Sequence, residues 1–156
     1  MQDRNMTKEQ TYPEQHRTIG ALLRIPFQHL AKEVYDELGR AGHGEVRRAH
    51  SVVFRYILPE GSRITELAER AGITKQSMAS LVEHLQKHGY LRSEPDPNDG
   101  RAKRVVLTRR GEEVQREAMR LSHEVEQRWA VLLGKKEMAT LRALLERLYD
   151  HLEGER

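Results

Sequence analysis

The sequence contains no cysteine, which excludes disulfide bonds, thiolate zinc sites and redox sensing through a thiol. No run of 18 apolar residues occurs, and residues 1–15 are polar without the apolar core of a signal peptide. We therefore expect a cytoplasmic protein without membrane contact. Walker, dinucleotide-binding and nucleophile-elbow motifs and paired metal motifs are also missing. The sequence predicts no catalytic residue, no cofactor and no metal, and hence a protein that is not an enzyme.

The charge of the chain is nearly balanced. Lys and Arg number 27 and Asp and Glu number 24, for a formal net charge of +3. That value is too small to indicate an acidic partner, so the positions of the charges carry the information. The 156 residues fit one compact domain, and the 33% of charged residues is typical of helices with long solvated faces.

Apolar residues recur every three or four positions in several segments, which predicts a mainly helical fold. The expected helices cover residues 17–38, 46–58, 65–70, 74–88, 114–132 and 138–152. Pro26 should bend the first helix, the hydroxyls of Thr65 and Thr74 should cap the third and fourth, and Gly134 should separate the last two. Residues 90–94 and 103–108 are predicted strands of a hairpin, joined through residues 95–100, in which Asp99-Gly100 is a strong turn signal. A hairpin that follows two short helices indicates a winged helix-turn-helix.

The segment 67–81 has the small and apolar residues that two helices need to cross over a tight turn. Ala68 allows close approach, Gly72 allows the turn, and Ile73, Met78 and Leu81 should fill the shared core. The outward face of the second helix should then reach base edges and phosphates in a major groove. The candidate DNA-contacting residues on this helix are Thr74, Lys75, Gln76, Ser77, Ser80 and His84.

The predicted hairpin is basic. The cations Arg101, Lys103, Arg104, Arg109 and Arg110 fall within ten residues, which favours contact with nucleic acid. Arg101 is the candidate for insertion into a narrow minor groove, with Asp99 orienting the loop or the arginine. Thr108 should cap the next helix, so Arg109 and Arg110 would stand in a first turn that disfavours cations. Phosphate contacts would explain that local cost.

These residues resemble the MarR family of winged-helix regulators over about residues 17–152. The matching runs are Leu67-Ala68-Glu69-Arg70-Ala71-Gly72-Ile73, residues 81–85 before Gly89-Tyr90-Leu91, and Asp96-Pro97-Asn98-Asp99-Gly100-Arg101-Ala102-Lys103 followed by Leu107-Thr108 and Gly111. The resemblance implies one domain over residues 17–153, with a winged-helix part at 45–111, dimerisation helices at 17–40 and 112–153, and a flexible arm at 1–16. It also implies a homodimer on double-stranded DNA with a pseudo-palindromic operator, usually as a repressor. A small aromatic or drug-like effector could release the DNA from a pocket between the two parts.

The chain departs from the family pattern in the middle of the reading helix. Members often carry arginines there, whereas the corresponding positions hold Ser80 and His84. Base recognition would then depend more on Lys75, Gln76 and Ser77.

Three other interpretations remain open from the sequence. His84 and His88 have the i, i+4 spacing of metal ligands on a helix, although no carboxylate motif accompanies them. The chain could be a winged-helix interaction protein that has lost DNA binding, in which case Arg101→Ala would change no activity. It could also be an enzyme, which turnover of a phenolic compound would reveal.

Overall fold

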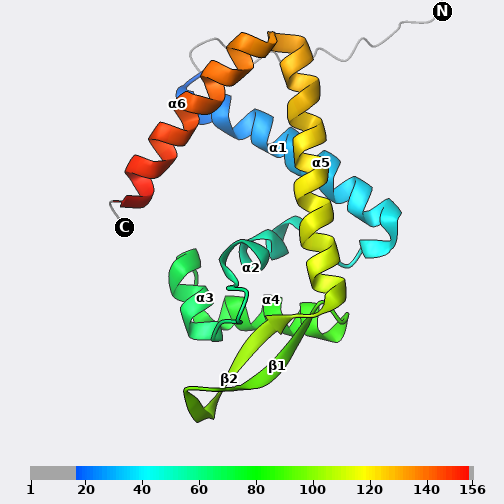
Figure 1. Cartoon of the computed structure of the whole chain (residues 1–156), viewed down its shortest axis with the longest axis vertical. Coiled ribbons are helices and arrows are strands. Elements are labelled where there is room, and N and C mark those ends of the chain that lie inside the picture. The colour runs from blue at the N-terminus through cyan, green and yellow to red at the C-terminus, as the bar shows by residue number, and fades with distance from the viewer. Residues whose placement is uncertain (1–16, 155–156) are drawn as a thin grey trace, which may run out of the picture.

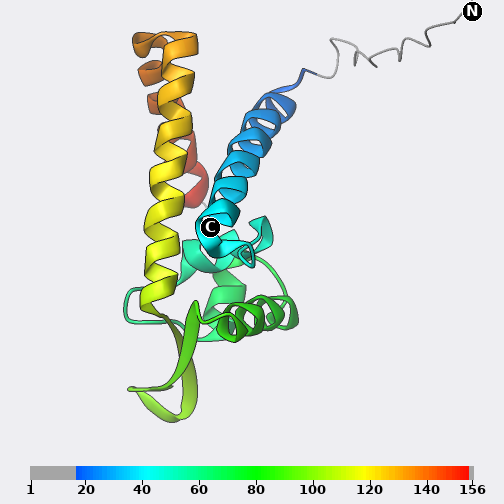
Figure 2. The ribbon, with the colours of Figure 1, turned by 90° about the vertical axis from the view of Figure 1, so that its right-hand side faces the viewer.

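The computed structural model describes residues 17–154 and shows a mainly helical chain with one antiparallel hairpin, as predicted (Figure 1). The predicted arm at residues 1–16 lies outside the described residues. The elements are α1 (Ile19–Leu38), a π-helical turn η2 (Gly39–His43), a 3₁₀ turn η3 (Arg48–His50), α2 (Ser51–Tyr56), α3 (Ile64–Ala71), α4 (Lys75–Lys87), β1 (Leu91–Asp96), β2 (Asp99–Leu107), α5 (Arg109–Leu133) and α6 (Lys135–Gly154). The helix-turn-helix and the hairpin occupy one end of the molecule, and α1, α5 and α6 extend to the other (Figures 1 and 2).

Helix α1 has nearly the predicted bounds and ends at Leu38. Thr18 begins it by accepting a hydrogen bond from the Ala21 N–H, and Pro26 lies inside the helix without ending it. Past Leu38 the chain continues through the π-helical turn until Gly42, whose φ is 91°. The C-terminal half of α1 packs against α5, and the ion pair between Glu33 and Arg128 joins the two helices. Residues 39–43 therefore connect the long helices to the winged-helix part.

The predicted helix at 46–58 is wrong in its bounds, since it divides into η3 and the short helix α2. The backbone at Arg47 is extended, and its N–H donates to Nδ1 of His50 at 2.9 Å. At the other end, Ile57 has extended backbone angles two residues before Pro59. A proline inside a helix removes a backbone hydrogen bond and clashes with the preceding turn, so a helix that runs to residue 58 is disfavoured. Val46, Val53 and Ile57 are nevertheless buried, so the segment contributes the apolar face that its pattern predicted.

Helices α3 and α4 form the predicted helix-turn-helix. Leu67, Ala68, Met78, Val82 and Leu85 are buried between them and the rest of the core, and the turn at Gly72 has the left-handed φ of 64°. Ile73 does not fill this core as predicted, because the turn leaves its side chain exposed.

The two expected threonine caps have different outcomes. Thr74 caps α4, and its Oγ1 accepts from the Ser77 N–H at 3.1 Å. Thr65 does not cap α3, which begins at Ile64 after Arg63. The Glu66 carboxylate accepts from the Arg63 N–H at 3.0 Å, so a side chain in the first turn of α3 satisfies the backbone donor of the residue that precedes the helix.

The strands pair antiparallel from Leu91↔Leu107 to Asp96↔Asp99, so the turn consists of Pro97 and Asn98. The turn lies within the predicted connection at residues 95–100, but that connection is too wide, and Asp99-Gly100 is not the turn, since both residues belong to β2. Gly100 lacks the positive φ that a two-residue Asp-Gly turn requires. The Asp96 carboxylate instead accepts from the Asn98 N–H at 2.8 Å, and proline suits the first central position of an ordinary turn. The hairpin is therefore longer than the sequence suggested.

A short bridge joins the hairpin to the chain ahead of α3. Ser62 and Val105 exchange two backbone hydrogen bonds of 3.0 and 2.9 Å. Gly61, with φ of 98°, lies so close to β2 that a Cβ atom there would stand 2.5 Å from Val106 Cγ1. This contact fixes the base of the wing against the helix-turn-helix.

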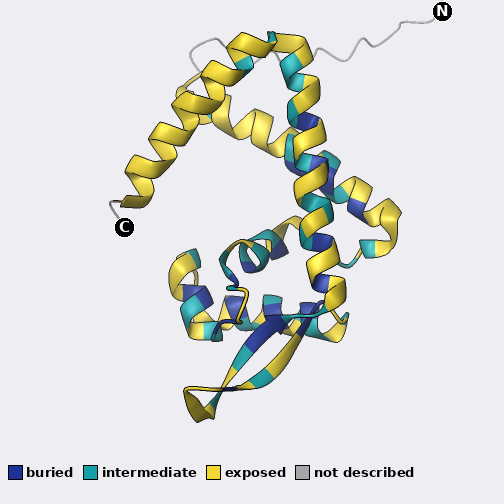
Figure 3. Cartoon of the chain, in the orientation of Figure 1, coloured by how far each residue is buried: buried dark blue, intermediate teal, exposed yellow. Residues whose placement is uncertain are grey.

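The helices at the other end are largely exposed (Figure 3), and many of their large apolar residues lie at the surface. Gly134, with φ of 101°, separates α5 from α6 as predicted, and no residue of α6 is buried. The exposed apolar surface, which we call the apolar end face, comprises Ile19, Leu22, Leu23, Ile25 and Phe27 of α1, Val131, Leu132 and Leu133 of α5, and Leu141, Leu144, Leu145, Leu148, Tyr149 and Leu152 of α6. None of the helices within residues 17–154 is long and apolar enough to cross a membrane.

Candidate nucleic-acid interface

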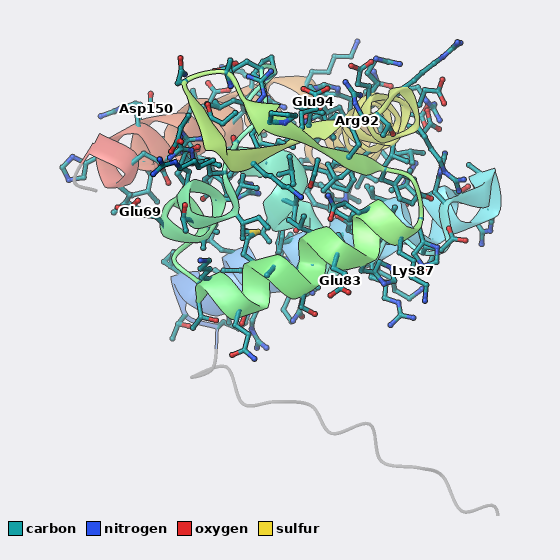
Figure 4. All side chains as sticks on the ribbon, turned by 90° about the horizontal axis from the view of Figure 1, so that it is seen from below. Glu69, Glu83, Lys87, Arg92, Glu94 and Asp150 are labelled. Carbon is teal, nitrogen blue, oxygen red and sulfur yellow. The ribbon has the colours of Figure 1, made fainter. Side chains whose placement is uncertain are left out.

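The N-terminal half of α4 presents polar side chains to solvent. Lys75, Gln76, Ser77 and Ser80 are exposed, as is the capping residue Thr74. The apolar positions of the same helix point into the core, because Met78, Val82 and Leu85 recur at helical spacing. Seen from the end of the molecule opposite the apolar end face, α4 lies across the front beside the hairpin (Figure 4). The structure thus brings the predicted residues of α4 together on one accessible face, except for His84.

His84 does not point outward as predicted. Its side chain is half-buried, and Nε2 lies 2.9 Å from the carbonyl oxygen of Glu45. Its ring stacks on that of His50, with 4.6 Å between the centroids. The helical pattern alone could not reveal this placement, because both partners come from the segment that follows α1.

Three imidazoles form a row at this contact. The His84 ring lies between those of His50 and His88, each 4.6 Å away. Within the described residues, no group of three or more metal-ligating side chains could hold an ion. Burial of His50, whose side chain is 4% exposed, lowers its pKa from 6.5 to about 4, and repulsion from His84, Arg47 and His88 acts in the same direction. The fold therefore favours neutral His50.

We expect His50 to make stability depend on pH. A histidine whose pKa is lowered in the folded state stays neutral there, while the unfolded chain binds a proton below about pH 6.5. The free energy of unfolding should therefore fall by about 2 to 3 kcal/mol between pH 6.5 and pH 4 from this group. His50→Asn keeps an acceptor for the Arg47 N–H and removes the titration. Urea unfolding across this range should show a shallower pH slope for the variant, and parallel curves would contradict the assignment.

The hairpin presents Arg101 and Lys103 to solvent, beside the turn. The Asp99 carboxylate accepts from the backbone N–H of Arg101 at 3.1 Å, so it orders the loop rather than the guanidinium. Arg101 is left with its side chain available for a partner, in the position that the sequence suggested for a wing tip.

Arg104 has a different environment from Arg101. Its side chain is 24% exposed and pairs with Glu94 across the hairpin at 3.5 Å. Its Nε atom is buried without a hydrogen-bond partner. This arginine therefore lies against the hairpin, with only part of its guanidinium facing solvent.

The two arginines in the first turn of α5 have partners within the protein. Arg109 is exposed and pairs with Glu113 at 3.1 Å. Arg110 lies over the Tyr90 ring at 4.6 Å, and its Nη2 donates to the Tyr90 hydroxyl at 3.0 Å. The contacts of Arg110 with Tyr90 also offset the unfavourable helix dipole, and phosphate contact by the two arginines stays a prediction. Thr108 caps α5 as predicted, and its Oγ1 accepts from the Gly111 N–H.

Arg63 belongs to the site and was missed from the sequence. Its Nε donates to Asp96 at 2.6 Å, and its Nη2 lies 3.7 Å from Asp99. A hydrogen bond from the Asn98 N–H and the Arg63 guanidinium hold the pKa of Asp96 below its usual range. Arg63 thus ties both ends of the hairpin turn to the start of α3. The partners lie 33 residues apart in the sequence, so no local pattern could pair them.

A cavity of about 420 Å³ lies between α1, α2 and α5. Its lining is mostly apolar and includes Phe27, Leu30, Val34, Phe54 and Val114, with Tyr35, Arg48, Arg55 and His123 as polar or charged groups. Arg48 lies over the Phe27 ring at 4.9 Å. Burial raises the pKa of the Tyr35 phenol, although its hydrogen bond with Ser51 opposes this. Such a cavity fits a small, partly apolar molecule with an acidic group.

Comparisons with known proteins agree with this architecture. The family model of the MarR family matches residues 46–102. A transcriptional regulator of Thermotoga maritima, Tm0710, is 27% identical with a TM-score of 0.63, over 87% of this chain and 94% of that one. A crystal structure of MarR is 23% identical with a TM-score of 0.75, over 94% and 100%. An F27L mutant of Staphylococcus aureus MepR, bound to an oligodeoxyribonucleotide, is 18% identical with a TM-score of 0.59, over 86% and 98%. No curated protein matches the sequence.

Proposed function

We propose that this protein is a regulator that binds a specific DNA operator and represses transcription from it, because residues 46–102 match the MarR family model and 94% of the chain matches a MarR crystal structure. The observation that carries the proposal is that α4 exposes a polar face and that the hairpin, which lies at the same end of the molecule (Figure 4), exposes Arg101 near its turn. The major groove is wide enough to admit an α-helix, and an arginine at a wing tip fits the adjacent minor groove. Lys75, Gln76, Ser77 and Ser80 would contact bases and phosphates.

We propose that the DNA-binding form is a homodimer. The apolar end face collects exposed side chains from three helices, and contiguous apolar surface of this kind marks an interface. Residues 17–40 and 112–153 would supply the dimerisation helices and residues 45–111 the winged helix. A symmetric dimer presents two copies of α4, so the operator would be a pseudo-palindrome with half-sites about one helical turn apart.

We propose that the cavity between α1, α2 and α5 binds a small aromatic effector with an acidic group. It lies between the apolar end face and the helix-turn-helix, so a ligand there would change how α1 and α5 meet the winged-helix part. Arg48 and Arg55 offer charge for a carboxylate, and the apolar lining offers contact for a ring. Such a ligand would relieve repression if it fitted the released arrangement better than the DNA-bound one.

Selection from fragmented genomic DNA tests the proposed function. The purified protein is incubated with fragments of its own genome at moderate salt, and bound fragments are sequenced. We expect enrichment of an inverted repeat. Arg101→Ala should weaken binding to that repeat by about tenfold or more, because it removes the wing-tip guanidinium. Arg116→Ala, which changes an exposed arginine of α5 that pairs with Glu112, is the matched control and should bind normally.

The contrary outcome favours a different function. If the wild-type protein enriches no sequence, and if Arg101→Ala behaves like the wild type, then the winged helix serves protein contacts and the regulator proposal fails. Extraction of the purified protein for bound small molecules should accompany the experiment, since a co-purified effector would hold the protein in its released state.

A further inference from the structure

The face of α4 that meets solvent carries an acidic residue, Glu83, beside the polar residues described above. The exposed positions Gln76, Ser80, Glu83 and Lys87 are separated by four, three and four residues, so they form one stripe along the helix. Figure 4 shows Glu83 and Lys87 on the side of α4 that faces away from the rest of the molecule. Because His84 turns toward Glu45 and His50, Glu83 replaces it as the outward residue of this turn.

We propose that Glu83 is a specificity-determining residue that reads a cytosine in the major groove. This inference rests on the proposed function, in which α4 is the reading helix. A carboxylate facing DNA is repelled by the phosphates, a cost that is offset when it accepts a hydrogen bond from a base. Cytosine presents the N4 amino group in the major groove as its donor, and Glu or Asp is the side chain that accepts from it.

The surroundings of Glu83 leave its carboxylate available for a base. None of the ion pairs within the described residues 17–154 involves Glu83, although Lys87 stands four residues later in the order that favours a pair. The neighbouring outward residues Ser80 and Gln76 are uncharged. The Glu83 carboxylate can therefore approach the floor of the groove without first breaking a salt bridge.

Because a glutamate accepts hydrogen bonds, the proposal predicts the base pair that Glu83 faces. Each half-site should contain a G·C pair at the position that Glu83 faces, with the cytosine amino group directed to the carboxylate. Glu83→Gln keeps the length of the side chain, replaces one acceptor oxygen by a donor and removes the charge. Gln pairs with adenine through its N6 and N7 atoms, so the variant should prefer A·T at that position or lose its preference there.

Selection from a random duplex library tests this proposal with three proteins. The wild type should select cytosine at one position of each half-site. Glu83→Gln should reduce the preference for cytosine over adenine there by about tenfold or more, keep the other positions, and bind non-specific DNA more tightly. Glu69→Gln makes the same charge change at an exposed site on α3 and should select the wild-type sequence. Thermal melting should be equal for all three, since both glutamates are exposed.

Two contrary results are distinguishable. If the wild type selects an inverted repeat and Glu83→Gln selects the same bases at every position, Glu83 is a solvated charge and the inference fails while the proposed function stands. If the wild type selects no sequence, the proposed function fails and the role of Glu83 fails with it.

Discussion

The double variant Leu144→Glu/Leu148→Glu should be monomeric and should lose binding to the inverted repeat. Both side chains are about half exposed in the single chain, at 55% and 44%, so the helix itself should fold normally. In a dimer formed by the apolar end face, the new carboxylates would be buried without partners, which costs several kcal/mol. We expect the dimer dissociation constant to rise about a thousandfold or more, roughly 4 kcal/mol.

Light scattering coupled to size exclusion measures this effect. The wild type should show twice the chain mass and the variant 18.2 kDa. Asp150→Lys is the matched control, because residue 150 lies about 200° around the helix from Leu148 and is exposed; it should remain dimeric. A dimeric double variant that still binds the inverted repeat would show that α6 is not part of the interface.

Gly61→Ala should strongly destabilise the fold. The backbone at Gly61 has a φ of 98°, and an added Cβ would stand 2.5 Å from Val106 Cγ1 and 2.8 Å from the Val105 carbonyl oxygen. Strain at positive φ and overpacking each cost about 1 to 3 kcal/mol, so we expect a loss of about 3 kcal/mol or more. The melting temperature should fall by about 10 °C.

The Gly61→Ala variant also tests the role of the bridge between Ser62 and Val105, through its melting temperature and its affinity for DNA. Because the hydrogen bonds of that bridge hold the hairpin base, its disruption should weaken DNA binding as well as stability. Gly44→Ala is the control, since Gly44 has an ordinary φ of −62° and open space around it. Equal melting temperatures for Gly61→Ala and the wild type would contradict the close approach of Gly61 to β2.

The fold could be predicted because its signals are local. Apolar spacing identified the long helices, Thr74 and Thr108 were recognised as caps, and small residues identified the crossing of α3 and α4. The errors arose where a distant or competing partner decides the geometry. The turn lies at Pro97 and Asn98, where the Asp96 carboxylate accepts from the Asn98 N–H. Helix α3 begins at Ile64, with Glu66 accepting from the Arg63 N–H, and not at Thr65.

The candidate site was predicted less completely, for the same reason. Helical spacing indicated that position 84 faces outward, yet a backbone carbonyl 39 residues away holds His84 inward. The contacts of Arg110 with Tyr90, 20 residues earlier, could not be predicted from the clustering of charge. Arg63 carried no local signal. The exposed residues of the first turn of α4 and of the wing tip were easier to identify, because exposure depends mainly on their own helix or hairpin.

We propose that this protein distinguishes one DNA sequence from others through α4 and the wing. The most direct test is the ratio of its affinities for the selected inverted repeat and for a scrambled duplex of the same length and composition, at one physiological salt concentration. We expect the repeat to bind about a thousandfold or more tightly, with one dimer per repeat. A ratio near one would mean that charge alone attracts the protein to DNA, and would contradict the account.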